Sequence, residues 1–198
     1  MPVAPPSGTS GDARAGSAQL GASEARVRSV PCRAGMQAEG VCVAISMIRI
    51  DDRLVHGQIV AAWSKELSIN RIWVIDDGVA HNSFISQLMK MAAPSEVKVD
   101  ITEASAIEGL AESYDTSDDN VLVLMKTPDV ARRLFDAGIA LRELNVGGMG
   151  ANASRSKLFK NISASDEEVA TLQQIKDAGV DVYFRVTPPE RKTEFTGR

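Results

Sequence analysis

The residues best suited to take part in a reaction are grouped in the octapeptide Asp51-Asp52-Arg53-Leu54-Val55-His56-Gly57-Gln58. A neutral imidazole such as that of His56 is a good nucleophile toward phosphorus. The guanidinium of Arg53 can hold an anion through two parallel hydrogen bonds. Gly57 lets the backbone approach an anion closely, and the side-chain amide of Gln58 can donate another hydrogen bond. The combination fits an anion or phosphoryl site.

The two aspartates of this octapeptide fit an orienting role. Asp51 or Asp52 could hold the arginine or select the imidazole tautomer. A carboxylate too close to a phosphoryl group would repel it, so neither is expected to touch that group. The residues alone leave an ordinary interpretation open, because an Asp-Asp pair after a strand is commonly a turn or a helix cap.

The elements around the octapeptide are predicted from the period of the apolar residues. Short β-branched runs predict strands, and they alternate with runs of helical period. The predicted strands are Val43–Ile50, Arg71–Ile75, Glu96–Ile101, Asn120–Met125, Glu143–Val146 and Val180–Arg185. The predicted helices are Gly57–Leu67, Val79–Met91, Pro128–Ala137 and one from the capping box Ser165–Glu168 to Gly179. This alternation predicts an α/β fold: a mostly parallel, open twisted sheet with helices on both faces, in a single domain.

Further candidates follow the ends of later strands, because ligands of open parallel sheets bind beyond the carboxyl ends of the strands. Lys126 and Thr127 follow the fourth predicted strand; Lys126 could steer an anion or be a solvated surface residue. Gly147 and Gly148 follow the fifth, and they could allow close backbone approach to the His56 loop or a sugar, or form a simple turn. His81 has no arginine beside it, and no catalytic role is expected for it.

The net charge and the lengths of the apolar runs argue against two classes of protein. The net charge of −4 argues against nucleic-acid binding, and the longest apolar runs are five residues, against the roughly 18 that a membrane-spanning helix needs. Ala, Gly, Ser and Pro make up 23 of the first 40 residues, which predicts a disordered extension over 1–40 and a folded domain over 41–198. Cys32 and Cys42 form no C-x-x-C pair, so no metal or redox site is predicted.

The stretch Arg49–Gln58, followed by Trp63, resembles the phosphorylation loop of the mannose/fructose/sorbose IIB family of the phosphoenolpyruvate:sugar phosphotransferase system (PTS). The resemblance covers about residues 44–195. Other segments similar to that family are Leu88–Pro94, Lys126–Pro128, Asn145–Met149, the Ser165–Glu168 capping box and Asp177–Val180. The extension 1–40 and the small, polar stretch Gly150–Ser156 depart from the family pattern.

The resemblance implies an activity and partners. His56 would accept a phosphoryl group, on Nδ1, from the phosphohistidine of a IIA protein and pass it to a hexose-type sugar presented by membrane IIC and IID subunits. The enzyme class would be protein-N(pi)-phosphohistidine–sugar phosphotransferase, with neither a cofactor nor a metal. The chain would be cytoplasmic, peripherally associated with the IIC/IID complex, and could form a homo-oligomer.

Two other functions compete with this one. A non-catalytic regulatory module of the same fold would carry the phosphoryl group on His56 as a signal. An unrelated α/β nucleotide- or anion-binding protein is less well supported, because the sequence has neither G-x-G-x-x-G nor G-x-x-x-x-G-K-[ST].

Overall fold

The computed structural model describes residue 1 and residues 45–107, 119–139 and 141–197. The chain divides into two units, Met1–Gly35 and Met36–Arg198, and the described strands and helices lie in the second. The predicted disordered extension over 1–40 lies, apart from residue 1, outside the described residues.

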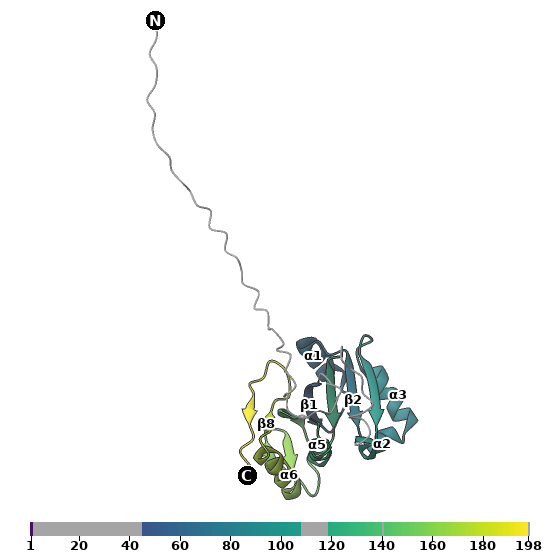
Figure 1. The fold of residues 1–198 in the computed structure, drawn as a ribbon, viewed down its shortest axis with the longest axis vertical. Helices are drawn as coiled ribbons and strands as arrows, with labels where there is room; N and C mark the ends of the chain where they lie inside the picture. The colour runs from purple at the N-terminus through teal and green to yellow at the C-terminus, as the bar shows by residue number, and fades with distance from the viewer. Residues whose placement is uncertain (2–44, 108–118, 140, 198) are drawn as a thin grey trace, which may run out of the picture. The chain divides into compact units, whose positions relative to one another are not determined.

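A mixed sheet dominates the described part of this second unit (Figure 1). Its order is β3-β2-β4-β1-β5-β8-β9, and all neighbouring strands are parallel except the last pair, β8 and β9. The strands are β1 (Ile45–Asp51), β2 (Arg71–Ile75), β3 (Lys98–Thr102), β4 (Val121–Met125), β5 (Glu143–Gly148), β8 (Asp181–Phe184) and β9 (Thr193–Glu194). The predicted mostly parallel α/β sheet is confirmed.

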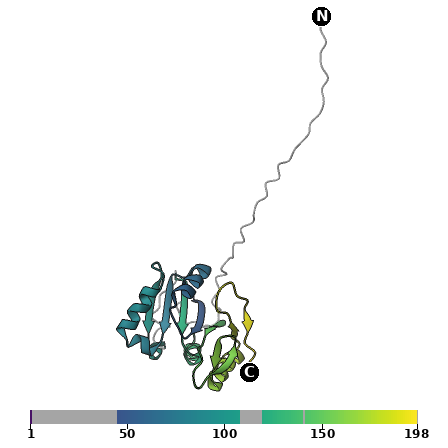
Figure 2. The ribbon, with the colours of Figure 1, turned by 180° about the vertical axis from the view of Figure 1, so that it is seen from behind.

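Helices cover both faces of the sheet, and Figure 2 shows the same arrangement from behind. The helices are α1 (Gly57–Leu67), α2 (Asp77–Ala80), α3 (Ser83–Ala92), the 3₁₀ turn η1 (Ala104–Ala106), α5 (Pro128–Asp136) and α6 (Asp166–Asp177). A separate antiparallel pair, β6 (Ser156–Phe159) and β7 (Ile162–Ala164), lies between β5 and α6 in the chain.

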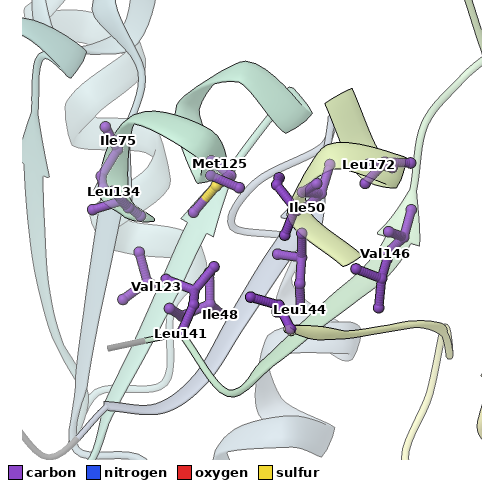
Figure 3. Close-up of a cluster of buried hydrophobic side chains, with 14 of the residues drawn as sticks. Ile48, Ile50, Ile75, Val123, Met125, Leu134, Leu141, Leu144, Val146 and Leu172 are labelled. Carbon is purple, nitrogen blue, oxygen red and sulfur yellow. The ribbon is translucent and has the colours of Figure 1, made fainter. Parts of the chain in front are cut away.

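Alternation of side chains along each strand makes two cores, one on each face. In β1, Ile48 and Ile50 belong to the core on the face covered by α5 and α6, which also contains Leu134 and Leu172 (Figure 3). In β4, Leu122 belongs to the other core, which includes residues of α1 and side chains of α3 packed against it. Strands buried on both faces are typical of parallel sheets.

The strand order creates a switch point between β1 and β4. From β1 the chain crosses through α1 to β2 on one side, whereas from β4 it crosses through α5 to β5 on the other. The loops that follow these two neighbouring strands therefore leave in opposite directions. Such a position is where open α/β sheets bind their ligands, and it is the carboxyl end of β1 that continues into the octapeptide.

Two predictions about elements were wrong in detail. The single helix predicted over Val79–Met91 is two helices, because the Asn82 side chain accepts a hydrogen bond from the N–H of Ile85 and begins α3 anew. The Gly147–Gly148 pair was expected after the fifth strand, but it lies inside β5. The hairpin of β6 and β7 and the short strand β9 were not predicted.

Candidate active site

The octapeptide lies at the switch point, between the end of β1 and the start of α1. His56 is the N-cap residue of α1, with an extended backbone (φ −113°, ψ 109°) and an exposed side chain. Its ring makes no capping hydrogen bond, and its carbonyl oxygen accepts the N–H of Val60 at 3.0 Å. The imidazole thus stands in solvent at the amino end of an eleven-residue helix.

A tight turn presents this histidine. The N–H of Leu54 donates to the carbonyl oxygen of Asp51 at 2.9 Å, and Leu54 has the left-handed φ of 54°. Non-glycine residues adopt that conformation only when their surroundings hold them there. Leu54 and Val55 are buried in the core on the α1 side, so burial of two apolar side chains holds the turn while Arg53 and His56 stay exposed.

Asp51 engages Arg53 on the same turn. Arg53 donates from Nε to Oδ1 of Asp51 at 3.0 Å and from Nη2 to Oδ2 at 3.1 Å, and its backbone N–H also donates to Oδ1 at 3.2 Å. Asp51 is 1% exposed and Arg53 is 40% exposed. The hydrogen bond to Asp51 raises the pKa of Arg53, so the guanidinium keeps its charge while one of its edges is occupied.

Arg49 is a charged residue buried inside β1 that sequence reasoning did not assign to the site. It is 1% exposed and donates to Oδ2 of Asp51 at 2.8 Å. It also donates to the carbonyl oxygens of Arg185 at 2.9 Å and Val186 at 3.1 Å, and to the Asn145 side chain. Burial lowers the pKa of Arg49, and Asp51 opposes that shift. An arginine between two isoleucines in the predicted strand was the signal that could have revealed it, because buried charges need partners.

Two glycines of β5 make room for this buried charge cluster. A Cβ on Gly147 would lie 1.8 Å from Cζ of Arg49, and one on Gly148 would lie 2.6 Å from Oδ1 of Asp51. Side chains at these positions would therefore collide with the groups that hold Arg53. The close backbone approach is to Arg49 and Asp51, which lie beneath the loop.

Asp52 takes a different partner from Asp51. Its Oδ2 accepts the N–H of Gly150 at 2.7 Å, and its own N–H donates to the carbonyl oxygen of Gly148 at 3.0 Å. Arg155 extends this link, because it donates to the Gly150 carbonyl oxygen at 3.1 Å and pairs with Glu168 of the α6 capping box. Asp52 thereby joins the octapeptide to the loop after β5.

Lys126, Thr127 and Gln58 are the remaining candidates. Lys126 follows β4 and pairs with Oδ1 of Asp76 at 3.0 Å. Thr127 is the N-cap residue of α5, but its side chain does not make a capping bond. Gln58 is exposed in the first turn of α1. His81 lies after α2 and is paired with Glu103 at 3.1 Å, so it belongs to a different cluster from Asp51 and Arg53.

The first turn of α1 adds backbone donors to the site. The N–H groups of Gly57, Gln58 and Ile59 precede the first intrahelical bond, which runs from Val60 to His56. No acidic residue stands in that turn, so the positive end of the helix dipole is not offset there by a carboxylate. Among the described residues, no three His, Cys, Asp or Glu side chains are grouped as metal ligands.

Comparisons with known proteins identify the family of this chain. Residues 45–197 match the family model of the PTS system sorbose subfamily IIB component. The PTS system sorbose-specific EIIB component of Lacticaseibacillus casei is 29% identical over 154 residues, which cover 78% of this chain and 94% of that protein. The PTS system mannose-specific EIIAB component of Escherichia coli (strain K12) is 25% identical over 150 residues, 76% of this chain and 46% of that protein.

A solved structure shows the same fold. The IIBSor domain of the sorbose permease from Klebsiella pneumoniae superposes with a TM-score of 0.73 at 26% identity, covering 77% of this chain and 93% of that one. In the described residues, no helix has both the length and the apolar character needed to cross a membrane. Because the family model spans most of the chain, this protein belongs to the sorbose subfamily of PTS IIB components.

Proposed function

We propose that this chain accepts a phosphoryl group on His56 from the phosphohistidine of a IIA protein and transfers it to a hexose-type sugar during uptake through membrane IIC and IID subunits. The observation that carries the proposal is the exposed imidazole of His56 at the start of α1, on the same turn as the guanidinium of Arg53. The relative named a mannose-specific EIIAB component supports a IIA partner. In this role the chain works in the cytoplasm, at the membrane complex.

The proposed chemistry has two balanced steps. In the first, the bond between phosphorus and the donor imidazole breaks while a bond from phosphorus to Nδ1 of His56 forms. His56 loses its ring proton and the donor ring regains one. In the second, a sugar hydroxyl attacks phosphorus, the bond to His56 breaks, and the hydroxyl proton ends on the His56 ring. Such transfers depend mainly on positioning and on stabilising spread negative charge.

Three groups would stabilise that charge without a metal or another cofactor. The N–H groups of the first turn of α1 form a ready site for an anion, and Gln58 stands among them. Arg53 supplies a permanent positive charge, through the edge of its guanidinium that faces away from Asp51. In the proposal, Asp51 and Asp52 orient this machinery. Lys126 and Thr127, which follow the neighbouring strand β4, contribute to binding the incoming partner.

Labelling with a phosphorylated IIA protein tests the assignment. The parent protein should acquire an acid-labile phosphoryl group, and His56→Ala should abolish it. His81→Ala serves as the matched control, because its imidazole is also exposed but is paired with Glu103; its labelling should equal that of the parent. Undiminished labelling of the His56 variant would contradict the proposed acceptor.

A second measurement separates transport from regulation. Labelled protein is mixed with membrane vesicles that contain IIC and IID subunits and a panel of hexoses. Transport predicts loss of the label from the protein and its appearance as sugar phosphate. A label that persists with every sugar would support the regulatory module instead.

A further inference from the structure

The helix α3 exposes three large apolar side chains on one side. Phe84 is 69% exposed, Leu88 is 47% exposed and Met91 is 76% exposed. Their spacing of four and three residues places them along one face of the helix. α3 has no buried residue, and apart from Met1 these three are the large apolar side chains that the described residues leave exposed.

The fold does not need this stripe, which we define as Phe84, Leu88 and Met91. The inward side of α3 is supplied by Ile85 and Met89, which pack against the core on the α1 side of the sheet. Phe84 and Leu88, by contrast, stay exposed. Side chains this large that stay in water contribute little to folding, and a group of them marks an interaction surface.

The stripe continues toward the phosphoryl site. α3 ends at Ala92, and a Cβ on Gly57 would lie 3.5 Å from the Ala92 carbonyl oxygen. Gly57 is the first residue of α1 and follows His56 directly. The last turn of α3, which carries Met91, therefore adjoins the first turn of the helix that presents the imidazole.

We propose that this stripe is the docking surface for the IIA phosphodonor protein, an inference that rests on the proposed function of His56. A donor that brings its phosphohistidine into contact with His56 must cover the surface around it. Specific protein complexes cover about 800 Å² on each partner, far more than one imidazole. Phenylalanine and methionine side chains are enriched in such interfaces, and the stripe offers both, with Met91 in the turn that adjoins α1.

The position of the stripe favours the donor over other occupants. A second copy of this chain seated permanently on α3 would crowd the approach to His56, which the transfer requires to be open. The exposed polar residues Gln87 and Lys90 border the stripe on the same helix. An apolar centre with a polar border is the usual arrangement of a protein interface, and three side chains make a small centre, which suits a donor that leaves after each transfer.

The test compares a protein donor with a small one. The double variant Phe84→Ser plus Met91→Ser is labelled by phosphorylated IIA protein over a range of donor concentrations, and separately by phosphoramidate. With the protein donor, kcat/KM should fall about tenfold or more, through a higher KM, as expected on losing central apolar contacts. Labelling by phosphoramidate and the thermal midpoint should stay at parent values. The control Arg133→Ser changes an exposed residue of α5, on the opposite face, and should alter neither rate.

The outcomes separate the two proposals. An unchanged kcat/KM for the double variant, with the parent labelled normally, would overturn the docking surface and leave His56 intact as the acceptor. If the double variant loses only the transfer to sugar in IIC/IID vesicles, the stripe belongs to the membrane complex. If it loses self-association, the stripe binds a second copy of the chain. Either result would also overturn the docking surface for the IIA protein. Failure of phosphoramidate and IIA protein alike to label the parent on His56 would instead remove the proposed function.

Discussion

Gly147 is needed because there is no room for a side chain at its position, and this predicts how a substitution there changes the stability of the fold. Its φ is outside the left-handed region in which the structure places Gly138 and Gly179, so its backbone would accept alanine. A Cβ, however, would lie 1.8 Å from Cζ of Arg49, 2.0 Å from Nη2 and 2.1 Å from Nη1. The substitution Gly147→Ala therefore forces the buried guanidinium of Arg49 to move.

The size of the effect follows from what Arg49 would lose. Its hydrogen bonds to Asp51 and to the carbonyl oxygens of Arg185 and Val186 are 2.8 to 3.1 Å long, and they cannot survive a shift that clears the new methyl group. Disrupting a buried charge pair costs about 3–5 kcal/mol. We expect Gly147→Ala to lower the free energy of unfolding by about that amount, a large part of the total for an ordinary domain.

Urea unfolding of four proteins measures this as a double-mutant cycle: the parent, Gly147→Ala, Arg49→Ala and the double variant. If the clash is with the guanidinium, Gly147→Ala should cost less than about 1 kcal/mol once Arg49 has been shortened, which leaves a coupling of about 2 kcal/mol or more. Gly78→Ala is the control, because its Cβ would lie 3.4 Å from Oδ1 of Asp76 and should be tolerated. Additive effects of the two substitutions would refute the collision with Arg49.

Two further variants test the candidate site and the start of helix α6. Arg53→Lys should slow the transfer of phosphoryl from the IIA protein, because an ammonium cannot form the two parallel hydrogen bonds that Arg53 forms with Asp51. The urea midpoint of this variant should stay near that of the parent. A transfer rate equal to that of the parent would reassign Arg53 to a structural role. Glu168→Ala removes the capping-box carboxylate of α6 and should cost about 1–2 kcal/mol in urea unfolding, whereas Glu167→Ala, at an exposed neighbouring position, should cost much less. Equal costs would contradict the capping assignment.

The sequence predicted those elements whose signals are local. β2 has the predicted bounds Arg71–Ile75, and α1 has the predicted bounds Gly57–Leu67. An apolar strand and an apolar helical stripe can each be recognised from a short stretch of sequence. The break between α2 and α3 was not predictable from period, since apolar spacing runs on through it. One side chain, that of Asn82, decides it by a hydrogen bond to Ile85.

The environment of the site needed long-range contacts that a pattern cannot supply. Arg49 was visible as a charge between two isoleucines of a strand, but its partners Asn145, Arg185 and Val186 lie far along the chain. For the same reason the sequence left open whether Gly147 allows close backbone approach or forms a simple turn, and the structure places it against Arg49. The β6 and β7 hairpin depends on a link of this kind as well, from the N–H of Ser163 to the carbonyl oxygen of Met149 at 2.8 Å.

Asp51 bears on how the proposed site could both take and release a phosphoryl group. Its carboxylate lies between two guanidinium groups, with Arg49 donating to Oδ2 and Arg53 donating to both oxygens. A phosphoryl group on His56 would bring about −1.5 to −2 charge and would compete with Asp51 for Arg53. Because Arg49 holds Asp51 from beneath, the carboxylate cannot swing away to leave Arg53 wholly to the phosphoryl group. In the proposed cycle, this competition limits how tightly the phosphoryl group is held, as a centre that is first acceptor and then donor requires.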